Sequence, residues 1–66
     1  MPISMSREEM IDDLVLTWRG IQALDAEFQI DLDEARAVWA AQPDDRLEIT
    51  YNQARATLWR LIRKNG

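Results

Sequence analysis

The chain has 66 residues, of which 47% are hydrophobic and 30% are charged, and its formal net charge is −4. This composition predicts a folded chain, and the length allows one helical domain over residues 1–66. With no Cys and no His, disulfides, the usual zinc sites and the common nucleophile and base pairs of enzymes are excluded. Only two Gly and two Pro, beside many strong helix formers, indicate an all-α protein.

The first helix is expected to begin at about Arg7, because Ser6 followed by Glu9 forms a capping box. An apolar stripe then repeats at helical spacing as far as residue 39. Its members are Met10, Leu14, Ile21, Phe28, Leu32 and Trp39. Because the stripe does not lose phase, the sequence predicts one long helix over about residues 7–41.

An alternative stays open between residues 28 and 34. Asp31 followed by Asp33 and Glu34 is itself an acceptable helix start. A helix that begins there would break the long helix near residue 30 and give a three-helix bundle. The stretch has no Gly, Pro or Asn, which favours the continuous helix.

A clear break comes at Pro43, which disfavours helix in the residue before it and suits the first turn of a new helix. The second helix is expected over about residues 44–64. One of its faces is apolar and carries Leu47, Tyr51, Leu58 and Leu61. Reversal at Pro43 predicts an antiparallel helical hairpin with arms of unequal length.

Two packed helices leave half of each apolar seam exposed, so a pair of hairpins in a homodimeric four-helix arrangement is expected. A second stripe on the first helix repeats every seven residues and supports this expectation. The residues expected in the core or the dimer interface are Leu14, Leu16, Ile21, Ala23, Phe28, Ile30, Leu32, Trp39, Leu47, Tyr51, Leu58 and Leu61.

Charge is unevenly distributed along the chain. All 12 acidic residues lie in residues 1–48, whereas residues 49–66 carry only the basic residues Arg55, Arg60, Arg63 and Lys64. In an antiparallel hairpin the basic end of the second helix would lie beside the acidic start of the first, and the two would screen each other. The net negative charge makes nucleic acid an unlikely partner.

Tryptophan is costly to expose and is enriched at binding hot spots, often beside arginine. Trp18 lies at the edge of the main stripe and Trp59 lies off the apolar face of the second helix. Both are candidate anchors for a partner protein. The expected partner-binding residues are Trp18, Arg19, Ile49, Arg55, Trp59 and Arg63.

These features favour a small homodimeric regulator, of the kind that phages, plasmids or bacterial operons encode, which binds a larger protein such as a DNA-binding regulator and modulates or inhibits it. The alternatives are a nucleic-acid-binding hairpin dimer that uses the basic end of the second helix, and a structural subunit of an assembly. No catalytic residue, cofactor or metal site is expected, since no phosphate-binding or EF-hand pattern occurs. No apolar run is long enough to span a membrane, which favours the cytoplasm.

No motif is specific enough to assign a family. Asp45-Arg46-Leu47 and the later Leu58 to Arg63 stretch resemble the Hha-type modulators of nucleoid proteins, and the hairpin layout resembles the Rop-type RNA-binding dimers. The second likeness is one of architecture, which does not establish function.

Overall fold

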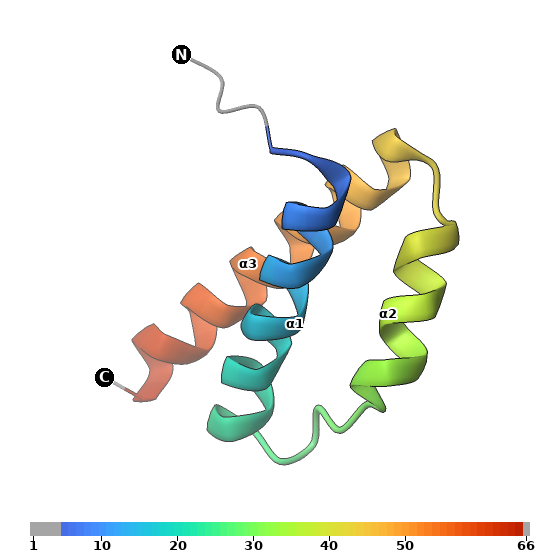
Figure 1. The fold of residues 1–66 in the computed structure, drawn as a ribbon. Coiled ribbons are helices and arrows are strands. Elements are labelled where there is room, and N and C mark those ends of the chain that lie inside the picture. The colour runs from blue at the N-terminus through green and yellow to red at the C-terminus, as the bar shows by residue number, and fades with distance from the viewer. Residues whose placement is uncertain (1–4, 66) are drawn as a thin grey trace.

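The fold is all-helical. The computed structural model describes residues 5–65, which form three helices and contain no strand: α1 (Arg7–Leu24), α2 (Leu32–Ala41) and α3 (Asp44–Asn65) (Figure 1). As expected, α1 begins after Ser6, whose side-chain oxygen accepts a hydrogen bond of 3.2 Å from the backbone N–H of Glu9. The turn at Pro43 also lies where the sequence places it.

The prediction of a single long helix over residues 7–41 is wrong, and the alternative of three helices with a break near residue 30 is confirmed. The chain leaves the helix at Asp25, whose carboxylate accepts a hydrogen bond from the N–H of Glu27. It re-enters at Asp31, whose carboxylate accepts from the N–H groups of Asp33 and Glu34 and caps α2. Aspartate side chains that bond to nearby backbone groups compete with helical hydrogen bonding, and here they end one helix and start the next.

The structure also corrects the antiparallel hairpin, because α1 and α3 run in the same direction. Arg7 bonds to Asp44, Asp13 to Tyr51, and Gly20 lies against Leu58, so contacts join residues 37 or 38 positions apart along the whole length of α1. Helix α2 lies to one side of this pair and runs back in the opposite direction (Figure 1). The basic end of α3 therefore lies near the end of α1, far from its acidic start.

The core lies where α1 crosses α3 and is closed on one side by Trp39 of α2. The buried apolar residues are Ile11, Leu14, Ile21, Trp39, Leu47, Ala54 and Leu61. Leu32, Tyr51 and Leu58 are half-buried. Four residues expected in the core or the dimer interface are exposed: Leu16, Ala23, Phe28 and Ile30. The core is therefore smaller than the apolar pattern of the sequence suggested.

Candidate functional site

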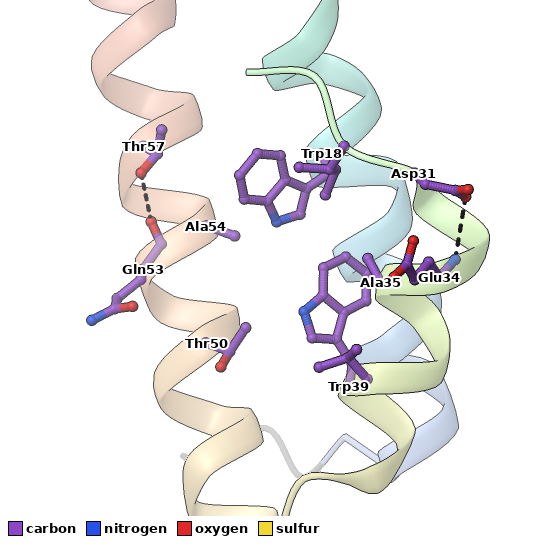
Figure 2. A pocket seen from close by; sticks show the side chains of 11 residues that line it. Trp18, Asp31, Glu34, Ala35, Trp39, Thr50, Gln53, Ala54 and Thr57 are labelled. Atoms are coloured by element: carbon purple, nitrogen blue, oxygen red, sulfur yellow. Dashed lines mark hydrogen bonds between the residues drawn. The ribbon is translucent and has the colours of Figure 1, made fainter. Parts of the chain in front are cut away.

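A groove of about 570 Å³ lies between α2 and α3. Helix α1 contributes Trp18 to its floor, and α2 contributes Trp39. Figure 2 shows both indole rings projecting between the two helices on the side of Ala54. The lining residues are Trp18, Ile30, Asp31, Glu34, Ala35, Val38, Trp39, Thr50, Gln53, Ala54 and Thr57.

The groove stays open because the residues that line α2 and α3 there are mostly too small to fill the space. Ala35 lies on α2 and Ala54 on α3, and Thr50 and Thr57 are the neighbours of Ala54 along the same side of α3. The Thr50 hydroxyl donates to the carbonyl of Arg46, and the Thr57 hydroxyl donates to that of Gln53. These two hydroxyls are therefore already hydrogen-bonded within α3, and the surface that the groove offers to a ligand is largely apolar.

The two tryptophans of the floor are fixed differently. Trp39 is only 6% exposed and belongs to the core. Trp18 is half-buried, and its ring packs against that of Phe28 with centroids 6.2 Å apart and planes tilted by 58°. This is a favourable aromatic geometry. Phe28, in the connection between α1 and α2, therefore holds the Trp18 ring in place.

Arg7 holds the far end of the groove in place. Its guanidinium donates to the Asp44 carboxylate at 2.5 Å and to the backbone carbonyls of Ala40 and Gln42 in the turn between α2 and α3. A positive charge at the C-terminal end of α2 also interacts favourably with the helix dipole. A second ion pair, between Arg36 and Asp12, joins the middle of α2 to α1. These contacts fasten α2 to α1.

The rim of the groove is acidic on one side. Asp31 and Glu34 lie on the α2 side, whereas the α3 side carries the neutral Thr50 and Gln53. The Asp31 carboxylate is engaged in capping α2. Glu34 is exposed and makes no ion pair with any residue between 5 and 65. Glu34 is therefore the acidic side chain of this rim that is available to a partner.

A polar cluster joins α1 to α3 on the other side of the core. The Tyr51 hydroxyl donates to the Asp13 carboxylate, and Arg55 lies 3.3 Å from both the carboxylate and the hydroxyl. The hydrogen bond to Asp13, followed by burial of the ring and the Asp13 charge, raises the pKa of Tyr51 above its usual 10.0, against the lowering effect of Arg55. Arg55 also stacks over the Tyr51 ring at 5.6 Å. Arg55 is thus part of the fold.

A second apolar area lies on the opposite side of the molecule, and we call Leu16, Ala23 and Trp59 the outer face. Leu16 and Ala23 lie on the side of α1 away from Leu14, and Trp59 lies on the side of α3 away from Ala54. Leu16 is 61% exposed and Trp59 is 58% exposed. An exposed Trp is a candidate anchor for a partner protein.

The sequence-predicted partner residues are divided between these surfaces. Trp18 is in the groove, Trp59 is on the outer face, and Ile49 is exposed beside the groove on α3. Arg19 and Arg63 are exposed and make no ion pair with the residues described, 5–65. None of the arginines expected to contact a partner lines the groove beside Trp18.

Sequence reasoning missed most of the groove. The sequence assigned no binding role to Ala35, Val38, Thr50, Gln53 and Thr57. These residues come from two helices, and they line one groove only because a break separates α2 from α1. The usable signal is the capping pattern at Asp31, which starts α2 as a separate helix and places Glu34 and Val38 on one of its faces.

The chemistry of the groove suits apolar binding. Its walls are indole rings, aliphatic groups and hydroxyls, and within residues 5–65 no cluster of acidic residues is arranged to hold a metal ion. None of the described helices is long and apolar enough to cross a membrane. Comparison with protein families, with curated proteins and with solved structures finds no match for this chain.

Proposed function

We propose that the protein is a small helical binding module that dimerises and binds a larger protein, such as a transcription regulator, whose activity it modulates or inhibits. The observation that supports binding of a larger protein best is Trp59 on the outer face, an indole that is 58% exposed, and the open groove between α2 and α3, with Trp18 and Trp39 in its floor, offers a second surface. Aromatic side chains in a concave apolar site are the usual recognition elements for a protein partner.

The small core adds support. Residues 5–65 bury only seven apolar residues, while eight large apolar residues stay exposed. A chain of this length is marginally stable on its own, and without Cys it has no disulfide to compensate. Covering the exposed apolar groups by protein contacts would supply the missing stabilisation.

The partner is testable by affinity capture from the source cells with the wild type, Trp59→Ala and Asn52→Ala as bait. Asn52 is exposed on α3 and serves as the matched control. We expect a protein retained by the wild type and by Asn52→Ala but retained at least tenfold less by Trp59→Ala, because a buried Trp anchor is worth about 2 kcal/mol or more. Titration of the purified candidate by calorimetry then measures the dissociation constants.

Two results would contradict the proposal. If no protein is retained specifically by the wild type, the chain is not a binding module for a larger protein. If the same protein is retained equally by all three baits, Trp59 is not the anchor, and the outer face is not the surface for this partner.

One observation favours nucleic acid as a second candidate partner. The parallel arrangement of α1 and α3 leaves Arg60, Arg63 and Lys64 exposed and without ion pairs among residues 5–65. In that case binding to duplex RNA or DNA should weaken steeply as salt rises, with a log–log slope of about −2 to −3 for three neutralised phosphates. Absence of binding at low salt removes this candidate.

A further inference from the structure

The groove between α2 and α3 is a wedge with a closed end and an open end. Figure 1 shows the two helices joined at their turn and diverging away from it. At the joined end Gln42 Oε1 lies 3.1 Å from the Thr50 hydroxyl, and Figure 2 shows Trp39 near the level of Thr50. The open end lies between Asp31, at the start of α2, and Thr57. A wedge of this kind suits a compact ligand better than a segment of chain, which has to continue at both ends.

The size of the groove is that of a small-molecule site. Its volume of about 570 Å³ lies within the roughly 300 to 1,000 Å³ of such sites, which are mostly apolar with a few polar groups. Both indole rings project into it (Figure 2), and the ring that packs on Trp18 among residues 5–65 is Phe28, not Trp39. The two indoles are thus free to pack against an aromatic ring of a ligand, edge to face or offset.

Polarity changes along the groove. Towards the closed end its lining is apolar, with Val38 and the buried Trp39 and Ala54. Asp31 precedes α2 and Glu34 lies in its first turn, so both carboxylates lie towards the open end. None of the lining residues, all within 5–65, is basic. A ligand that matches this order has an apolar body and a positive charge at one end.

The start of α2 would by itself favour an anion at the open end, because free N–H groups and the helix dipole are positive there. The Asp31 carboxylate removes this preference, since it accepts the N–H groups of Asp33 and Glu34. The Glu34 carboxylate has no ion-pair partner among residues 5–65, and the chain carries a net charge of −4. Charge at the open end therefore favours a cation.

We infer that the groove binds a small aromatic amine in its ammonium form, with the ring against Trp18 and Trp39 and the ammonium group beside Glu34 at the open end. Trp18 lies nearer that end than Trp39 does (Figure 2), so the face of its indole also attracts the cation. This inference goes beyond the proposed function, which Trp59 supports best, and it leaves the outer face free for the larger protein.

The first test is a nuclear magnetic resonance titration with three probes that share one ring and differ in charge. Naphthylmethylamine, as the ammonium ion, should bind at low salt with a dissociation constant of about 1 mM or below, and about tenfold more tightly than naphthoate. Neutral naphthylmethanol should lie between them. The three tryptophans give three indole N–H signals, which Trp18→Phe and Trp59→Phe assign. The Trp18 signal should move with the ammonium probe, and the Trp59 signal should stay in place.

The second test removes the charge at the open end. Glu34→Gln should bring the affinities for the ammonium probe and naphthoate within about threefold of each other, and should leave naphthylmethanol within about twofold of its wild-type affinity. Glu48→Gln is the matched control, because Glu48 is exposed on α3 outside the groove and the two variants have the same net charge. It should keep the preference for the ammonium ion.

The third test fills the groove. Ala35→Leu should weaken all three probes about tenfold or more, because the added side chain occupies the space that the ring needs. Ala23→Leu makes the same substitution on the outer face and should change the affinities less than about twofold. Thr57→Leu fills the groove from α3, in case Ala35→Leu loses helicity by circular dichroism.

Several results would overturn the inference. One is a Trp18 signal that does not move with any probe at about 5 mM. A Trp59 signal that moves as far as that of Trp18 places the probes on the outer face, and a preference for the ammonium ion that survives in Glu34→Gln removes the ion pair. If the Trp18 signal moves on dilution of the protein alone and no probe changes it, a second copy of the chain occupies the groove. None of these results affects capture of a larger protein through Trp59, so failure of the inference can be distinguished from failure of the proposed function.

Discussion

Asp13 is the residue on which the junction of α1 and α3 depends most. Its carboxylate accepts the Tyr51 hydroxyl and pairs with Arg55, while its backbone carbonyl accepts the hydroxyl of the buried Thr17. In the sequence, Asp13 is one of several acidic residues near the start of the first helix. Its partners lie about 40 residues away on α3, so no local pattern could have identified them.

The pH dependence of stability should report the Tyr51 to Asp13 hydrogen bond. The folded state holds the pKa of Tyr51 above the usual 10.0, so the stabilisation is complete below about pH 10 and is lost as pH rises through the raised value. Urea unfolding between about pH 8 and 12 should show this loss in the wild type and a flatter profile in Tyr51→Phe. Tyr51 is the only tyrosine, so the difference between the two profiles isolates it. Parallel profiles would show that the hydrogen bond does not form.

Gly20 lies where α1 packs closely against α3. A Cβ atom there would lie 3.2 Å from a terminal methyl carbon of Leu58, a half-buried side chain that can move by a few tenths of an ångström. Alanine in a helix is about 1 kcal/mol more favourable than glycine, so Gly20→Ala should raise the free energy of unfolding by about 0.5 kcal/mol. Gly20→Leu should lower it by about 1 to 3 kcal/mol through overpacking. Chemical denaturation measures both, and a destabilised alanine variant would contradict this account.

At the scale of the helices, the sequence predicted the two ends that have strong local signals. Ser6 begins α1, and Pro43 separates α2 from α3, which ends at Asn65 against an expected end near Lys64. It favoured a continuous helix and kept the break before α2 only as an alternative, because Asp25 to Asp31 is a stretch of seven residues and a heptad advances the helical angle by nearly two full turns. The apolar stripe therefore keeps its phase across a segment that is not helical.

Helix α2 should depend on the carboxylate of Asp31. That side chain accepts two backbone N–H groups at the start of a helix of only 10 residues. Asp31→Ala should cost about 1 kcal/mol, whereas Asp33→Ala, which removes an exposed acidic residue of the same turn, should cost less than about 0.5 kcal/mol. Thermal unfolding followed by circular dichroism compares the two. Equal losses would mean that charge near the dipole, and not the cap, starts α2.

At the scale of the whole molecule, helix content followed from composition, whereas the relative direction of α1 and α3 did not. An apolar stripe specifies which side of a helix is buried but not whether its neighbour runs parallel or antiparallel. The groove was unpredictable for the same reason, since its floor and both walls come from three separate helices. Burial was predicted correctly for Leu14, Leu47 and Leu61, because the apolar face of a single helix is sufficient to predict it.

If the chain dimerises, the melting temperature should depend on protein concentration. Dimerisation stabilises the folded state by mass action, so a 100-fold increase in concentration should raise the melting temperature of the wild type by several degrees. A variant that stays monomeric over the same range should melt at the same temperature at both concentrations. A wild-type melting temperature that does not change with concentration would contradict the dimer.

The constant offset of 37 or 38 residues between α1 and α3 has a consequence for how the chain folds during synthesis. Helical proteins usually fold fast because most of their contacts are local, but here the main core is made between the first and the last helix. The ribosome must release most of α3 before Leu14 and Ile21 can be fully buried, because a nascent chain that ends at Ala41 lacks Leu47, Ala54 and Leu61 of the core. Completion of the last helix is thus the event that commits the whole chain to its native fold.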